Sequence, residues 1–429
     1  MILIYQFLSI VIGPLLPFYL KARLKKGKED KLRYNEKLGK NYPATFTDKG
    51  NGVLWFFAAS LGESKSVLPI INHLVSNGYK IVVTTGTLTS AEFLKNNLPQ
   101  GAIHVFSPLD NTSIIKKFIK HFKPKALFLV EEELWPNLVL TCKSQGLKLV
   151  FLGAKFSLAS STKWFKYKKS FTYLLKQFDF IYTSAKYQGA DVFDLCGVAY
   201  QKMDSLKYAQ VAALTSNKSK KLDICCEDGF DIESKNSVVF ISSHSSEEQI
   251  VAKAIKQISA KLPNFIALIA PRHIDTCSSL LQNLQSQGLN VVTLSSGQKV
   301  SSNHDVLIVD AMGLVPSCIN TTGVSIVCGS FVDGIGGHNI LEPAALVKPV
   351  ITGEFNQNFD DIIDAMLDSG AVIKSNSQLV CGEVVKLFQN KSKYREFAGK
   401  AHDFAMQKSQ SHIELTNKII NDIFNDKPN

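Results

Sequence analysis

Residues 53–85 read VLWFFAASLGESKSVLPIINHLVSNGYKIVVTT, and this stretch decides the fold class. Val53–Ala58 is an apolar run of strand length, Ser66–Ser76 is predicted to be a helix, and Lys80–Thr85 is predicted to be a second strand. A strand, a helix and a strand in succession form a βαβ unit with parallel strands. We therefore expect an α/β fold whose parallel sheet is covered on both faces.

The same alternation extends on both sides of a polar, aperiodic stretch at residues 211–236. Before it, we predict strands at Ile103–Phe106, Ala126–Val130, Lys148–Leu152 and Phe180–Thr183, with helices at Ser90–Asn97 and Asn111–Phe122. After it, we predict strands at Val238–Ser242, Phe265–Ala270, Asn290–Leu294, Val306–Val309, Val324–Cys328 and Pro349–Ile351, with helices at Glu247–Ala260 and Ser278–Ser286. The sequence thus predicts two doubly wound domains, residues 21–210 and 237–429, joined by a linker at 211–236 and facing a cleft. We expect the last helix to pack back on the first domain. Ligands of such sheets bind at the carboxyl ends of the strands.

Composition narrows the class of protein. The 429 residues are 45% hydrophobic and 20% charged, which excludes wholesale disorder. Lys and Arg number 48 against 37 Asp and Glu, and the net charge of +11 favours an anionic partner. The eight cysteines have no zinc-type spacing, so we expect reduced thiols and no metal.

The N-terminus departs from the soluble pattern, because Ile2–Leu20 carries no charge. As a helix it would be about 28 Å long, close to the thickness of a bilayer core. Seven Lys and Arg residues follow between Lys21 and Arg33, which places the rest of the chain on the cytoplasmic side. We expect residues 1–20 to be a single membrane anchor on the inner membrane. Two alternatives remain open: a segment lying in the interface, since Pro14 and Pro17 weaken the helix, and an apolar helix docked on the protein itself.

Acidic residues follow two of the strands predicted in the first domain. Glu63, beside Gly62, comes directly after the first strand, where a carboxylate can take a proton from an acceptor hydroxyl. The alternative, equally weighted, is that Glu63 only favours the positive end of a helix. Three consecutive acids, Glu131–Glu133, end another strand and repel one another unless cations or hydroxyls answer them. A solvated acidic turn is the alternative.

The second domain carries the features expected of a nucleotide site. Arg272 ends a strand and its planar group suits a phosphate. A glycine-rich turn, Gly329–Gly337, precedes a helix start whose backbone favours anions. Glu342 can accept hydrogen bonds from the hydroxyls of a ribose. Neither a P-loop nor a GxSxG motif occurs. A basic stretch with interleaved aromatic residues, 163–176, suits lipid phosphates, or is an ordinary amphipathic helix.

Taken together, the ordered motifs ASLGE, EEELWPN, SSHSSEE, APRH, DAMG and GGHNILEP resemble the 3-deoxy-D-manno-octulosonic acid (Kdo) transferases of Gram-negative bacteria. That family has the GT-B fold. The resemblance implies transfer of Kdo from CMP-Kdo to a lipid A precursor (lipid IVA) with inversion of configuration, in lipopolysaccharide biosynthesis. It implies an acceptor-binding first domain, a CMP-Kdo-binding second domain, anionic lipids as neighbours, no cofactor beyond the co-substrate, no metal and no nucleic acid.

The resemblance also assigns roles to individual residues. It makes Glu63 the general base and places Glu131 and Lys202 near the reacting centre as transition-state stabilisers. The CMP-binding residues are Pro271, Arg272, Met312, Gly313, Leu314, Asn339, Ile340, Leu341 and Glu342. Further candidates for the site are Ser60, Gly62, Glu133, Lys155, His273, Ser330, Gly337 and His338. The sequence departs from the family pattern at Lys155 and Ala159, which replace arginines, at Leu314, which replaces a glutamate, and at Ile340, which replaces a proline.

Two other functions fit parts of this pattern. A GT-B transferase or epimerase that uses a UDP-sugar would share the fold and the glycine-rich turn. A catalytically inactive lipid-binding homologue would share the apolar N-terminus, and the missing arginines motivate this alternative.

Overall fold

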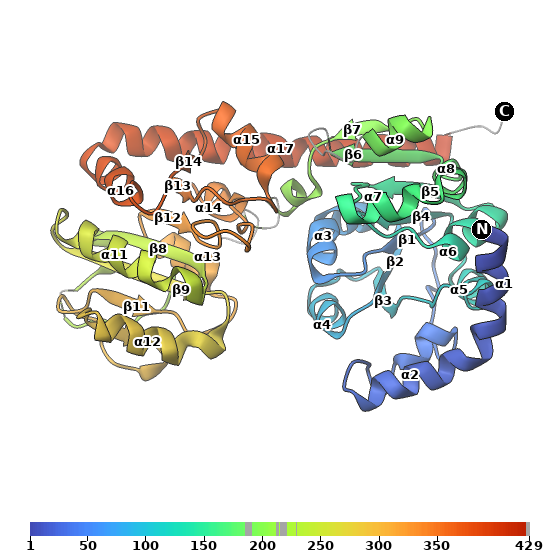
Figure 1. The fold of residues 1–429 in the computed structure, drawn as a ribbon, viewed down its shortest axis with the longest axis horizontal. Coiled ribbons are helices and arrows are strands. Elements are labelled where there is room, and N and C mark those ends of the chain that lie inside the picture. Colours follow the sequence, from blue (N-terminus) through green and yellow to red (C-terminus); the bar gives the residue numbers. More distant parts are fainter. Residues whose placement is uncertain (185–190, 212–213, 215–220, 229, 426–429) are drawn as a thin grey trace. The chain divides into compact units, whose positions relative to one another are not determined.

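A computed structural model describes all residues except 185–190, 212–213, 215–220, 229 and 426–429. The chain divides into two compact units, residues 1–210 with 410–429, and residues 211–409. The linker predicted at 211–236 lies partly outside the described residues. Each unit holds one seven-stranded parallel sheet (Figure 1).

The sheet of the first unit has the order β3-β2-β1-β4-β5-β6-β7. Its strands are β1 Val53–Phe57, β2 Lys80–Thr85, β3 Ala102–Phe106, β4 Ala126–Val130, β5 Lys148–Leu152, β6 Phe180–Ser184 and β7 Gln201–Met203. The helices are α1 Ile2–Ile12, α2 Leu16–Lys25, α3 Leu61–Ser76, α4 Leu88–Asn97, α5 Thr112–Phe122, α6 Pro136–Ser144, α7 Leu158–Phe165, α8 Lys168–Leu175 and α9 Asp191–Cys196. The chain order changes direction between β1 and β4, which is where ligands of doubly wound sheets bind.

The sheet of the second unit has the order β10-β11-β9-β8-β12-β13-β14. Its strands are β8 Asn236–Ser243, β9 Phe265–Pro271, β10 Val291–Thr293, β11 Val306–Ile308, β12 Val324–Val327, β13 Val350–Thr352 and β14 Ile373–Lys374. The helices are α11 Glu248–Ser259, α12 Cys277–Ser286, α13 Val315–Thr321, α14 Leu341–Ala345, α15 Asp360–Asp368, α16 Val380–Gln389 and α17 Lys391–Asn425. Here the change of direction falls between β8 and β12.

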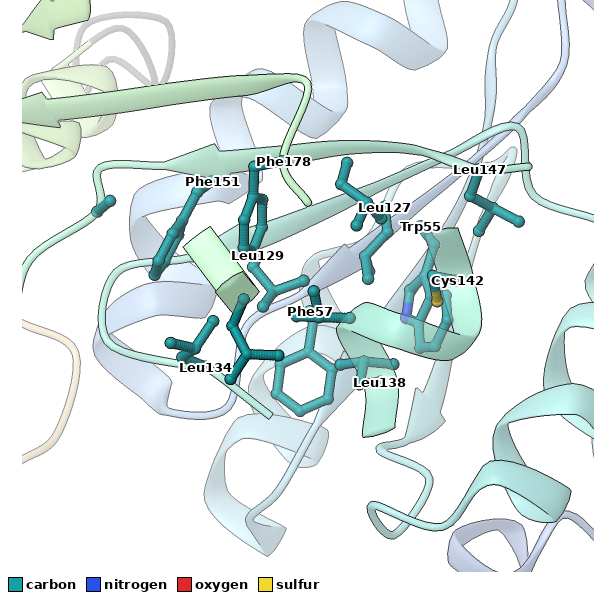
Figure 2. Packing of buried hydrophobic residues seen from close by; sticks show 14 of the residues in the cluster. Trp55, Phe57, Leu127, Leu129, Leu134, Leu138, Cys142, Leu147, Phe151 and Phe178 are labelled. Carbon is teal, nitrogen blue, oxygen red and sulfur yellow. The ribbon is translucent and has the colours of Figure 1, made fainter. Parts of the chain in front are cut away.

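Aromatic and branched side chains fill the core of the first unit on both faces of its sheet. On one face, Trp55 stacks on Phe118 with ring centroids 4.1 Å apart, and its indole N–H donates to Thr84 (2.9 Å). Figure 2 shows this cluster around Trp55 and Phe57. On the other face, isoleucines of the last part of α17, such as Ile420, join residues of β1 and α3. Strands buried on both faces explain their unbroken apolar runs.

The prediction of two doubly wound α/β sheets is confirmed. Most predicted elements occur within one or two residues of the expected bounds. The helix expected at Ser66 begins earlier, at Leu61, because Ser60 caps it by accepting a hydrogen bond from the N–H of Glu63 (3.2 Å). The short strands β7 and β14 were not predicted, since three and two residues carry too little periodicity to detect.

Candidate active site

Glu63 lies in the first turn of α3, just past the carboxyl end of β1. Its carboxylate accepts hydrogen bonds from the N–H of Ala59 (2.7 Å) and from the hydroxyl of Ser60 (2.8 Å). The pKa of Glu63 is raised from 4.5 to about 7: burial is the main cause, the charges of Glu131 and Glu133 act in the same direction, and the hydrogen bond from Ser60 opposes the shift. A carboxyl group with a pKa near neutrality is suited to general base catalysis.

The acidic segment after β4 lies close to Glu63, because β1 and β4 are adjacent in the sheet. Glu131 adopts a left-handed backbone conformation (φ 59°), which is unusual for a residue other than glycine and is common at functional sites. Its carboxylate forms an ion pair with Lys155, which follows β5. The indole N–H of Trp135 donates to Glu133, whose pKa burial raises. The three acidic residues therefore do not form a simple solvated turn: Glu131 is paired with the cation of Lys155, and Glu133 accepts a hydrogen bond from Trp135.

Ser60 and Lys155, two of the further candidates, thus contact the acidic residues directly. Lys155 supplies one ammonium group, where an arginine would offer a planar fork with two parallel donors. Gly62 is exposed within the first turn of α3, and a methyl group there would meet only the Ser60 hydroxyl, 3.9 Å away. The structure therefore brings four of the predicted site residues together beside the carboxyl ends of β1 and β4: Ser60, Glu63, Glu131 and Lys155.

Lys202 is placed differently. It lies on the edge strand β7 with an exposed side chain. Four strand spacings separate β7 from β1 in the sheet order, which corresponds to about 19 Å. Within the first unit, Lys202 is therefore not brought beside Glu63, and its assignment stays a prediction.

The candidates of the second unit follow the carboxyl ends of three strands of one sheet, β11, β9 and β12. Arg272 and His273 are exposed after β9, and Pro271 ends that strand. Met312, 77% exposed, and Gly313 lie between β11 and α13, and Leu314 is the residue before that helix. Asn339 and the buried Ile340 lead into α14, which begins at Leu341 and carries Glu342 in its first turn. The structure thus brings these residues to one edge of one sheet.

Close backbone packing explains the glycines of the turn after β12. A methyl group at Gly329 would lie 2.5 Å from the ring of His338, and one at Gly337 would lie 2.7 Å from the amide oxygen of Asn356. Both residues also have left-handed φ angles. The hydroxyl of the buried Ser330 accepts from the N–H of Gly353 (2.7 Å) and so ties the turn to the next strand.

Glu247 is a residue that the sequence motifs did not single out for a role. Its side chain is fully buried and accepts from the N–H groups of Gly329 (2.7 and 2.8 Å), Ser330 (3.2 Å) and Phe331 (3.1 Å). These three donors therefore serve Glu247, although we expected the turn to offer its N–H groups to a phosphate. A glutamate three residues after His244 at a helix start is the signal that reveals it.

The basic and aromatic stretch at 163–176 has a buried part and an exposed part. Trp164 stacks on the buried Phe171 with centroids 5.1 Å apart, so these two rings belong to the core. Tyr167 and Tyr173 are about half exposed. Two of the five aromatic residues are therefore exposed, and the other three, Trp164, Phe165 and Phe171, pack in or against the core. Among the residues the structure describes, no group of three or more His, Cys, Asp or Glu side chains is arranged to hold a metal.

Comparison with known proteins agrees with this reading. A model of the 3-deoxy-D-manno-octulosonic-acid transferase (kdotransferase) family matches residues 31–210. A probable mitochondrial 3-deoxy-D-manno-octulosonic acid transferase of Arabidopsis thaliana is 28% identical over 90% of this chain and 87% of its own length. The Rickettsia bellii 3-deoxy-D-manno-octulosonic acid transferase is 28% identical over 88% of each chain.

The solved structures support the fold. A glycosyltransferase from Rickettsia africae superposes with a TM-score of 0.58 at 11% identity, covering 90% of this chain and all of that one. At that identity the likeness shows the GT-B-like architecture alone. The similarity to Kdo transferases rests on the sequence relatives. In its motifs and over most of its length, the chain is therefore similar to the 3-deoxy-D-manno-octulosonic acid transferases.

Proposed function

We propose that this protein transfers Kdo from CMP-Kdo to a lipid A precursor with inversion of configuration. The observation that carries the proposal is the Glu63 carboxyl group, whose pKa of about 7 suits a base at the switch point of the first sheet. Glu63 takes the proton of a sugar hydroxyl on the acceptor. The resulting oxygen attacks the anomeric carbon of Kdo opposite the CMP leaving group, so one displacement inverts the configuration.

The remaining acidic-site residues stabilise this step. Burial is the main cause of the raised pKa of Glu63, and Glu131, which pairs with Lys155, adds to it. We propose that Glu131 orients the acceptor or stabilises charge on the sugar. Lys202 keeps the stabilising role that the family resemblance implies. The residues at the ends of β9 and β11, and those leading into α14, bind the nucleotide. Arg272 neutralises the phosphate of the leaving group, and no metal takes part.

The direct test is to incubate membranes carrying the protein with CMP-Kdo and lipid IVA and to analyse the lipid by mass spectrometry. We expect a lipid heavier by Kdo, and anomeric inversion in its NMR spectrum. The variant Glu63→Gln should abolish the product, while Glu92→Gln, an exposed acid on α4, serves as the matched control. Absence of a Kdo-bearing lipid with an active donor, or full activity of Glu63→Gln, would refute the proposal.

The rival functions give different results in the same material. An enzyme that uses a UDP-sugar would be stabilised against heat by UDP rather than CMP, because cytosine and uracil present opposite donors and acceptors. An inactive lipid-binding homologue would give no product, and its Glu63→Ala variant would behave like the original in a transferase-deficient strain.

We further propose that the N-terminal helices attach the protein to the cytoplasmic face of the inner membrane by lying in the interface. One helical segment, Ile2–Lys25, is long and apolar enough to cross a bilayer. However, Tyr5 donates to Asp110 (2.8 Å), Asn111 donates to the carbonyl of Ser9 (2.8 Å), and Leu20 is buried. These contacts hold one side of α1 and α2 against the first unit, whereas the other side exposes large apolar residues such as Phe7 and Phe18.

Basic residues accompany that apolar surface. A cavity of about 450 Å³ is lined by Ile10, Lys116, Lys117 and Lys120, together with Thr112 and Ser113. Lysines beside an apolar helix favour a surface of anionic lipids. The double variant Phe7→Ser/Phe18→Ser should reduce sedimentation with vesicles containing phosphatidylglycerol, while activity toward a short-chain soluble acceptor persists. Unchanged vesicle binding would contradict this attachment.

A further inference from the structure

Three histidines meet where the chain order of the second sheet changes direction. His244 follows β8, His273 follows β9, and His338 lies in the turn after β12. The Nε2 atoms of His244 and His338 are 2.7 Å apart, which is a hydrogen-bond distance. Their ring planes are 1° from parallel with centroids 5.0 Å apart. Rings whose nitrogens are so much closer than their centres meet end to end, so these two imidazoles share a hydrogen bond rather than stack.

The fold holds this pair from both sides through one buried carboxylate. The carboxylate of Glu247 accepts from the backbone N–H of His244 (3.2 Å) and from the backbone N–H of Gly329. The ring of His338 packs against Gly329. Ser242 adopts a left-handed φ of 56°, and the pairing of β8 with β9 shifts register at this point. Bulges of this kind re-aim a side chain at the end of a strand. The buried carboxylate and the bulge in β8 therefore fix the positions of the two histidines.

The pair can hold one additional proton without losing its hydrogen bond. With both rings neutral, one Nε2–H donates to the other Nε2, and one Nδ1 is unprotonated. A proton added at that Nδ1 makes the pair cationic and leaves the bridge intact. A second added proton would put hydrogens on both bridging nitrogens and break it. The pair therefore switches between two states that differ by one proton.

The surroundings keep the free pair neutral. The pKa of His338 is lowered from 6.5 to about 4, mainly by burial, with His244, Arg272 and His273 acting in the same direction. Burial also lowers the pKa of His244, with His273 and Arg272 acting in the same direction and Glu247 acting against them. Arg272, in the loop after β9, is thus a cation that opposes protonation of the pair, whereas the buried Glu247 favours it. An anion placed beside the pair would reverse this balance.

We propose that the His244–His338 pair, with Arg272 and His273, is the receptor for the phosphate of the nucleotide, and that the pair takes one proton from solvent when the phosphate binds. This inference deepens the proposed function and rests on it. The proton goes to the free ring nitrogen, and no covalent bond forms or breaks. Before transfer the cationic pair neutralises the phosphate, and afterwards it offsets the charge that develops on the departing CMP. Product release then returns the proton to solvent.

The test is calorimetry of CMP binding at pH 7.5 in two buffers with different enthalpies of ionisation. The slope of the observed enthalpy against the buffer enthalpy counts the protons that binding takes up. We expect about one proton for the unmodified protein with CMP and none with cytidine, which lacks the phosphate. The phosphate is already largely a dianion at this pH, so its own titration cannot supply the uptake. Affinity for CMP should accordingly fall as the pH rises above neutrality.

Variants assign the proton to the pair. His244→Gln and His338→Gln should bind CMP at least tenfold more weakly and without proton uptake, while His304→Gln, elsewhere in the same unit, should behave as the unmodified protein. Circular dichroism checks that the variants fold, and the measurement on the unmodified protein needs no variant. CMP binding with no proton uptake, or uptake unchanged in both variants, would overturn the inference and leave the proposed function intact.

Two further outcomes separate the sources of the anion and the two proposals. Uptake with free Kdo but not with CMP would assign the pair to the sugar carboxylate and overturn the inference. Binding of UMP with one proton taken up, and no binding of CMP, would refute the proposed donor but support the phosphate receptor. Failure of both nucleotides to bind would overturn both proposals.

Discussion

Replacing Glu63 by glutamine should make the protein more stable at alkaline pH while abolishing its activity. The folded-state pKa of Glu63 is about 7 against an ordinary value of 4.5, chiefly because its carboxylate is desolvated. A raised pKa means that the unfolded chain ionises first, so the folded state loses stability as the pH rises from about 4.5 to about 7. A difference of this size corresponds to about 3 kcal/mol. Glutamine carries no charge and keeps one acceptor oxygen, which can serve the N–H of Ala59, while its NH2 group replaces the oxygen that accepts from the hydroxyl of Ser60.

The assay is urea-induced unfolding of the unmodified protein, Glu63→Gln and the control Glu92→Gln at pH 5 and pH 8. At pH 8 we expect Glu63→Gln to gain roughly 1–3 kcal/mol, since some of the hydrogen bonding to Ala59 and Ser60 is weakened. At pH 5 most of that gain should vanish, because the natural carboxyl is then protonated. Glu92→Gln should change the free energy of unfolding little at either pH.

The same pKa sets the pH dependence of catalysis. A base with a pKa of about 7 is ionised about tenfold less at pH 6 than at pH 8, so kcat/KM should fall about tenfold between them. The alternative role for Glu63, as a charge at the positive end of α3, makes the opposite forecast for stability. If Glu63→Gln is less stable than the unmodified protein at both pH values, the residue acts as a cap and the reasoning fails.

Other variants test the surroundings of the two sites. Glu133→Gln removes a like charge near Glu63, so the acidic limb of the activity profile should move to lower pH; an unmoved limb would contradict the coupling. Glu247→Gln should lower the free energy of unfolding by about 2 kcal/mol or more in urea titrations, because three buried N–H groups lose a charged acceptor. Gly329→Ala should lower it by about 1 kcal/mol or more and weaken CMP binding, whereas Gly399→Ala, in open space on α17, should be neutral or stabilising.

The sequence predicts the sheets well because buried parallel strands are apolar on both faces and read as short unbroken runs. Val53–Phe57 and Ala126–Val130 are fully buried and lie within one residue of the expected bounds. Edge strands lack this signal: β7 has two exposed residues out of three, and nothing in its composition distinguishes it from a loop. The sequence also gives no strand order, so it could not show that β7 lies four positions from β1.

The candidate site is predictable where a residue belongs to a motif at the end of a strand, and is less so where a residue supports another residue. Glu63 and Glu131 lie just after strands, and their positions in the motifs are enough to identify them as candidates. Glu247 is harder to find, because its partners are backbone N–H groups some 80 residues away along the chain, and backbone partners leave no mark in the sequence. The pairing of His244 with His338 is hidden for a similar reason, since 94 residues separate them.

In both sheets a residue with a left-handed backbone conformation lies at the end of a strand where the strand order changes direction. In the first sheet the direction changes between β1 and β4, and Glu131, the residue directly after β4, has a φ of 59°. In the second it changes between β8 and β12, and Ser242 at the end of β8 has a φ of 56°. Neither is a glycine, so each conformation is unfavourable by about 1 kcal/mol or more and persists only because neighbouring contacts fix it. Glycine would adopt both conformations at a lower cost, whereas Glu131 and Ser242 place a side chain directly at each switch point.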